Sequence, residues 1–443
     1  MEGQAVARRL REHLELRHRA SPRTTTWSIS KRRAVGKERT TDGVATAPVF
    51  SVGKTPTQDS HTPRRLTRYV QRTYPVAWVS PARWRKPRGA SGGRQWMKSG
   101  WSVLSALVED AADGHLDRGV LRELIDTLHD TRDPEALTLL AFARALARRD
   151  QALHDHANLY LRQLAVPQIE LFQMLGAALP PWVDASRLVR DQLRFALEGA
   201  EAVTLVSIGC GTGQREAELL SGLGARRWHV FLVEPNADCL EQATRAVHDA
   251  ADRAGASLAL QPVWEVAEYL PPSFFEAVAM APAPRAVMAS FALHHMGDLE
   301  TRDSRADLFH AFFEAGIDVV SIAEPSSDHR VACLRERFEN ARRHFGQAFR
   351  HIDAQPIGAD HKARVKLMFF GRELEDILGR DEERVEQHEP VQRWVERVER
   401  AGFAPPPWLA RFESGRTCRI SPHALGFGDT DDPLIAVVAG VRA

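Results

Sequence analysis

Apolar positions recur at helical spacing from residue 101 onward. Val103, Leu104, Leu107 and Val108 fall on one face of a helix that Gly114 is expected to end. Two further stretches repeat this spacing before residue 150, and the second opens with an Asp-Pro pair that favours a helix start. These later stretches contain Leu121, Leu124, Ile125 and Leu128, and residues 133–149. We therefore predict a helical cap over residues 97–200.

After residue 200 the pattern changes to short apolar runs that alternate with helical stretches. The run 203–208 is β-prone and apolar at almost every position, which is typical of a parallel strand buried on both faces. Four similar runs follow, within 228–236, 256–266, 284–298 and 317–329. Strands that alternate with helices predict an α/β fold with a doubly wound, Rossmann-like sheet over residues 201–443.

Glycines at every second position follow the first predicted strand. Gly209, Gly211 and Gly213 lead directly into a helical stretch, and Glu234 ends the second predicted strand. No lysine follows the glycines, which excludes a Walker phosphate loop. Gln214 stands where the dinucleotide fingerprint has its third glycine, which disfavours a pyrophosphate ligand. The remaining pattern suits S-adenosylmethionine, with Glu234 on its ribose; a tight turn without any ligand is the alternative.

The segments SIGCGTGQ and LVEPN resemble the first two motifs of class I S-adenosylmethionine-dependent methyltransferases. Ser207 departs from that pattern, because the family usually has an acid there that helps to hold the methionine amine. The resemblance and the later strand ends together predict the cofactor-binding residues. These are Ser207, Gly209, Cys210, Gly211, Gly213, Glu234, Pro235, Trp264, Glu265 and Phe291.

Polar side chains at the ends of the fourth and fifth predicted strands are candidates for catalysis. His294, His295 and Glu324 could each act as a base if a methyl acceptor must lose a proton, or could be hydrogen-bonded core residues. Adjacent residues of a strand point to opposite faces, so the two histidines are not expected to hold a metal together. No metal site is predicted.

The C-terminal third contains the most specific sequence motifs. From the residues alone, 331–345 and 391–398 are cover helices and EERVEQHE is a solvated charged turn. These motifs nevertheless resemble the GRAS family signature, and the resemblance extends to the strands that end near His294 and Glu324. The matching elements are Phe370–Glu373, Glu383–Glu389, Trp394 and Ala401–Phe403.

This resemblance implies a methyltransferase-like Rossmann core with a helical insertion at 328–403. Plant GRAS proteins are transcriptional regulators, most of which have lost the glycine-rich loop. Bacterial relatives that keep the loop are thought to be small-molecule methyltransferases. We therefore predict an S-adenosylmethionine-dependent methyltransferase, a transferase that acts on a small-molecule methyl acceptor. The alternative is a non-catalytic regulator that holds a ligand and presents the 328–403 helices to a partner.

Charge divides the chain in two. Residues 1–100 contain 22 Lys and Arg against 6 Asp and Glu, whereas the remainder contains 37 against 52. The basic tail at 1–96 lacks apolar periodicity and is predicted to be disordered. It could bind nucleic acid, although solvated charge without a core function is the favoured interpretation. Four separated cysteines and no membrane-length apolar run predict a soluble cytoplasmic protein. The oligomeric state cannot be read from the sequence.

Overall fold

The computed structural model describes residues 90–149, 159–162, 164–298, 302–381 and 384–443. Helix α2 (Ala90–Ala112) begins ahead of Met97, the predicted start of the helical cap. The predicted tail up to residue 89 lies outside the described residues. Within the described part of the chain, no helix is both long enough and apolar enough to cross a bilayer. The cytoplasmic location stays a prediction.

A single mixed sheet of eight strands forms the centre of the fold. The strand order is β3-β2-β1-β4-β5-β8-β7-β6. The first five strands in this order are parallel, and β8 then pairs antiparallel with β5. The strands are β1 Ala202–Ile208, β2 Arg227–Val233, β3 Ser257–Val263, β4 Arg285–Ser290, β5 Val319–Pro325, β6 Cys418–Ser421, β7 Ala424–Gly428 and β8 Pro433–Val441.

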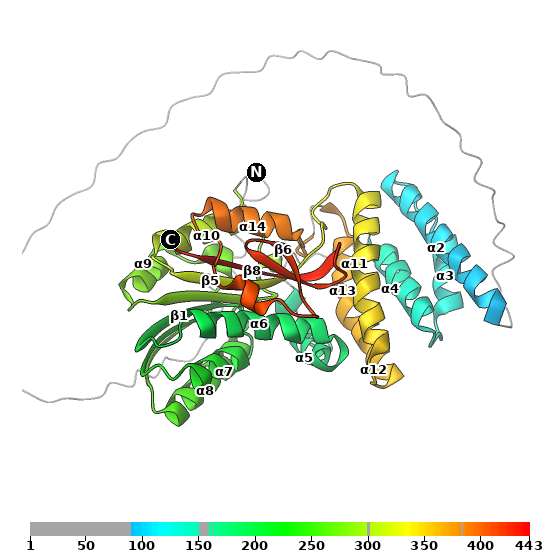
Figure 1. Ribbon diagram of the computed structural model, residues 1–443. Coiled ribbons are helices and arrows are strands. Elements are labelled where there is room, and N and C mark those ends of the chain that lie inside the picture. Colours follow the sequence, from blue (N-terminus) through cyan, green and yellow to red (C-terminus); the bar gives the residue numbers. More distant parts are fainter. Residues whose placement is uncertain (1–89, 150–158, 163, 299–301, 382–383) are drawn as a thin grey trace, which may run out of the picture. The chain divides into compact units, whose positions relative to one another are not determined.

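Helices cover both faces of this sheet (Figure 1). On β1, Val203 and Leu205 pack into one hydrophobic core, and Val206 and Ile208 pack into a second core on the opposite face. The first face is covered by α6 Pro180–Ala196, α7 Gln214–Leu223 and α8 Ala237–Ala254, and the second by α9 Pro272–Met280, α10 Ser304–Glu314 and α14 Val391–Arg400. The predicted α/β fold with a central sheet is thereby confirmed.

The N-terminal helices pack on the C-terminal insertion. After α2 come α3 (Arg118–Leu128) and α4 (Pro134–Arg148), and Asp133 caps α4 by accepting a hydrogen bond from the Ala136 N–H at 2.8 Å. Phe142 of α4 lies between the rings of Trp101 and Phe338, each at a centroid distance of 5.6 Å. The remaining helices are α5 Gln168–Ala178, α11 Leu334–Ala354, α12 Ala359–Arg364 and α13 Phe370–Ile377.

Candidate ligand-binding site

The glycine turn after β1 is shaped by packing as well as by conformation. All three glycines have positive φ, at 65°, 54° and 74°. A Cβ on Gly209 would lie 2.4 Å from the Ala292 Cβ, and one on Gly213 would lie 2.5 Å from the Ala243 Cα. Gly211 differs, because no atom of the described residues, its chain neighbours aside, lies within 4 Å of its Cβ position. At Gly209 and Gly213, neighbouring residues therefore leave no room for a Cβ, whereas Gly211 leaves open space at the edge of the sheet.

Glu234 holds this turn in place. Its two carboxylate oxygens accept hydrogen bonds from the Gly211 N–H at 2.9 Å and from the Asn236 N–H at 3.0 Å. The side chain is buried, which raises its pKa, while these two hydrogen bonds act in the opposite direction. The acid predicted to bind a ribose thus also stabilises the backbone that would face the ligand.

An acid reaches Ser207 from the next helix. The Ser207 hydroxyl donates a hydrogen bond to a carboxylate oxygen of Glu216 at 2.6 Å, and both side chains are buried. The other Glu216 oxygen is buried and has no hydrogen-bond partner in the part of the chain that the structure describes. The methyltransferase pattern has an acid at position 207, and here α7 supplies one nearby. Glu216 was not among the predicted site residues, and its only signal in the sequence was its place on the inward face of that helix.

The other predicted cofactor residues lie at the ends of four neighbouring strands. The Trp264 indole N–H donates to the Pro235 carbonyl at 2.7 Å, and the Trp264 side chain stays half exposed. Glu265 accepts from the Val266 N–H, and Cys210 is buried beside the glycines. Phe291 has a φ of 58° and stacks on Trp182 of α6 at a centroid distance of 3.4 Å. Their roles toward a ligand stay predictions.

The two adjacent histidines converge, contrary to the prediction. Strand β4 ends at Ser290, and residues 293–295 form a 3₁₀ turn, so the alternation expected of a strand does not apply. His295 Nδ1 lies 3.1 Å from one carboxylate oxygen of Glu386, and His294 Nε2 lies 3.7 Å from the other. His294 Nδ1 donates to Glu324 at 2.6 Å. The prediction that the imidazoles point to opposite faces is wrong.

The segment that supplies Glu386 is buried, although the residues alone predicted a solvated turn. Glu386, His388 and Glu389 are each less than 5% exposed. Glu389 pairs with Ser326 beside the end of β5, and Asp376 accepts the Glu386 N–H at 2.6 Å. This segment places Glu386 and His388 beside His294 and His295, and we call these four residues the histidine cluster. The GRAS wording was the only signal in the sequence that marked these residues.

Burial and neighbouring charges set the protonation of the cluster. Burial raises the pKa of Glu324 to about 7. Burial would raise the pKa of Glu386 as well, but the positive charge of His295 brings it to about 2. Burial and the neighbouring His295 hold the pKa of His294 well below its usual range. Glu386 is therefore paired with His295, and His294 is neutral.

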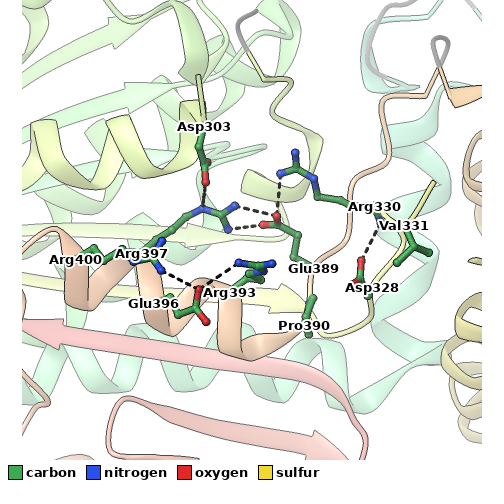
Figure 2. A pocket seen from close by; sticks show the side chains of 10 residues that line it. All are labelled: Asp303, Asp328, Arg330, Val331, Glu389, Pro390, Arg393, Glu396, Arg397 and Arg400. Carbon is green, nitrogen blue, oxygen red and sulfur yellow. Dashed lines mark hydrogen bonds and ion pairs between the residues drawn. The ribbon is translucent and has the colours of Figure 1, made fainter. Parts of the chain in front are cut away.

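On its other side the same segment meets an arginine network (Figure 2). Arg397 forms a bidentate ion pair with Glu389, and Arg330 donates to Glu389 at 2.8 Å. The fully buried Arg305 lies 3.5 Å from the same carboxylate, and Arg397 also contacts Asp303 at 2.9 Å. A pocket opens above this network. It is lined by Asp303, Asp328, Arg330, Val331, Glu389, Pro390, Arg393, Glu396, Arg397 and Arg400.

Comparisons with known proteins identify the family. The GRAS domain family model matches residues 222–424. Scarecrow-like transcription factor PAT1 of Arabidopsis thaliana is 31% identical over 28% of this chain and 26% of its own length. DELLA protein GAI of Gossypium hirsutum is 23% identical over 67% of this chain and 58% of its own. The chain thus spans about a quarter of PAT1. The resemblance to the GRAS family predicted from the motifs is confirmed over residues 222–424.

A solved structure shares the fold. SCL7 of Oryza sativa is 21% identical, has a TM-score of 0.62, and matches 78% of this chain and 99% of its own. At that identity the likeness supports the fold alone. Methyltransferase structures also match, but the CurJ carbon methyltransferase has a TM-score of only 0.38. A match at that level carries no functional conclusion.

The prediction of an enzyme is wrong. The curated relatives carry the names of Scarecrow-like, DELLA and related proteins, one of them a transcription factor, and none is named as an enzyme. The chain was also predicted to be a methyltransferase, and so a transferase, with S-adenosylmethionine as methyl donor, and this classification is wrong as well. A small-molecule methyl acceptor has no support. A shared fold does not carry a shared activity. This correction concerns catalysis and does not concern the binding of a ligand without turnover.

Proposed function

We propose that this chain is a non-catalytic regulatory protein of the GRAS family that binds a small ligand at the Gly209–Gly213 turn. The regulatory part is supported by the relatives, since PAT1 is named as a transcription factor. One observation supports the ligand-binding part. The backbone at Gly211 faces open space in a left-handed conformation, at the carboxyl edge of a parallel sheet where ligands of open α/β folds bind.

The ligand that we propose is S-adenosylmethionine, bound without methyl transfer. The Gly211 backbone is open to close approach, and Glu234 lies at the end of β2 with acceptor capacity for ribose hydroxyls. Ser207 and Glu216 place a buried acid near the expected position of the methionine amine. These groups supply an amine partner, a ribose partner and a bare turn, which are the three parts that this ligand requires.

Binding without turnover fits the state of the predicted catalytic residues. His294 and Glu324 are almost fully buried and hydrogen-bonded to each other, and Glu324 also accepts three backbone N–H groups. His295 is paired with Glu386. Side chains engaged in this way stabilise the sheet edge, so we propose that they position the strand ends and do not transfer protons to or from a substrate.

Replacing Gly211 by Asn tests the ligand site. Asn tolerates a left-handed backbone, so the fold is kept while the new side chain fills the open space. We expect S-adenosylmethionine binding to weaken by about a hundredfold or more, equivalent to roughly 2.8 kcal/mol. Isothermal titration on the full chain measures this. Glu234→Gln should weaken binding by about tenfold, because it removes a charge-assisted acceptor.

Gly224→Asn is the matched control. Gly224 has a φ of 71° and, like Gly211, no atom within 4 Å of its Cβ position, but it lies at the far end of α7. This variant should bind as the wild type does. Equal affinity in Gly211→Asn and the wild type would contradict the proposed site, as would a wild-type protein that fails to bind.

A further inference from the structure

We propose that His294, His295 and Glu386 bind a divalent transition-metal ion such as Zn²⁺. Each of the three offers one ligand atom, and these atoms lie within 4.8 Å of one another. Two imidazoles and one carboxylate form a ligand set that zinc and non-haem iron sites use. None of the three residues belongs to the Gly209–Gly213 turn, and the proposal does not depend on the ligand proposed there.

The distances are close to those that a metal requires. Two ligands at about 2.1 Å from a tetrahedral zinc ion lie roughly 3.4 Å apart. One Glu386 oxygen lies 3.1 Å from His295 Nδ1 and the other lies 3.7 Å from His294 Nε2, and one ligand atom from each of the three residues lies within 4.8 Å of the others. Small side-chain rotations would bring all three atoms to one centre. The ion would replace the direct ion pair between His295 and Glu386.

The surroundings of His294 are those of a metal ligand. A metal-binding histidine almost always donates its second ring N–H to a carboxylate or carbonyl, which fixes the ring and its tautomer. His294 Nδ1 is hydrogen-bonded to Glu324 at 2.6 Å, and in the tautomer in which Nδ1 is the donor, Nε2 faces Glu386 with its lone pair. The Glu386 backbone N–H is held in turn by Asp376. Glu324 and Asp376 would act as positioning residues.

Several buried polar atoms here lack a hydrogen-bond partner among the described residues. Both carboxylate oxygens of Glu386, Nδ1 of His295 and both ring nitrogens of His388 are in this state, although Glu386 lies within ion-pair distance of His295 and His388. Buried polar groups are normally satisfied, so such a concentration indicates a group that binds them. His388 Nε2 lies 3.7 Å from Glu386 and offers a fourth nitrogen.

Metal analysis of the purified full chain tests this proposal. We expect about one zinc or iron ion per chain, and Co²⁺ added to chelator-treated protein should give the visible absorption of a tetrahedral or five-coordinate site. Glu386→Gln and His295→Gln each remove a ligand and should lower Zn²⁺ affinity by more than the roughly 10–100-fold that follows loss of an outer partner in Glu324→Gln.

His423→Gln is the matched control, because His423 is equally buried but bonds the Ala439 carbonyl away from this cluster. It should bind metal as the wild type does. The wild type alone keeps the test decisive if the ligand variants fail to fold: a chelator should lower its melting temperature, and Zn²⁺ should restore it. Wild-type protein that holds no metal and gives no Co²⁺ spectrum would overturn the proposal, as would unchanged affinity in Glu386→Gln.

Discussion

Replacing Glu389 by Gln is expected to lower the free energy of unfolding by roughly 3–5 kcal/mol. The substitution keeps the shape of the side chain and removes its charge. Glu389 is buried and contacts the guanidinium groups of Arg305, Arg330 and Arg397. Arg305 is itself fully buried, so it would lose its only ion-pair partner among the described residues within 4.0 Å. Uncompensated buried charge is the main source of the loss.

Urea unfolding of the two proteins measures this difference, and pH provides a second check. Burial alone would raise the pKa of Glu389, but its bond to Arg397 and the nearby arginines lower it overall. A carboxylate with a lowered folded-state pKa contributes stability above its unfolded pKa, and that contribution is lost as the pH falls through the folded value. The difference in the free energy of unfolding between the wild type and Glu389→Gln should therefore become smaller below about pH 4.

Glu396→Gln, on helix α14 beside the Glu389 network, is the control (Figure 2). Glu396 contacts Arg393 at 3.4 Å and Arg400 at 3.5 Å, and all three side chains are exposed. Exposed ion pairs contribute about 0–1 kcal/mol, so this variant should unfold almost as the wild type does. If both variants lose similar amounts of stability, the buried network contributes no more to the free energy of unfolding than the exposed ion pairs do.

Gly213→Ala is expected to destabilise the fold by roughly 3 kcal/mol, through left-handed backbone strain and overpacking. The new Cβ would lie 2.5 Å from the Ala243 Cα and 2.9 Å from the Ala243 carbonyl oxygen. Both are backbone atoms of α8, which cannot move away as a flexible side chain would. Helices α7 and α8 would have to separate, although their contact covers one face of the sheet.

Gly224→Ala isolates the strain from the collision. Gly224 has a φ of 71°, close to the 74° of Gly213, and an added Cβ would meet no atom within 4 Å. It should cost about 1 kcal/mol, which is the strain alone. Chemical denaturation of both variants gives the difference. If the two glycines prove equally tolerant of Ala, the close packing of α7 on α8 is not what fixes Gly213.

The sequence predicted the sheet and the glycine turn because their signals are local. An apolar run, three glycines and an acid at the end of the next strand lie within about thirty residues, and each favours the same structure. Ordinary burial patterns likewise predicted α3 and α4. By contrast, Glu216 carries no such signal, because its contact with Ser207 depends on how α7 packs against β1.

The buried charges could not be predicted from local pattern. EERVEQHE has the composition of a solvated turn, and only distant partners such as Arg305, Asp376 and Arg397 allow its acids and histidine to be buried. His294 and His295 were misplaced for a related reason. The chain leaves β4 at Phe291 with a positive φ, which no periodicity predicts, and both imidazoles then face Glu386. The prediction of an enzyme failed because it carried activity over from a fold.

Native mass spectrometry of the full-length protein with S-adenosylmethionine tests the central claim most directly. We predict one ligand per chain with its mass unchanged after prolonged incubation, and no adduct in Gly211→Asn, the variant that fills the open turn while keeping its backbone. Absence of an adduct in the wild type, or an adduct with the mass of the demethylated product, would contradict binding without turnover.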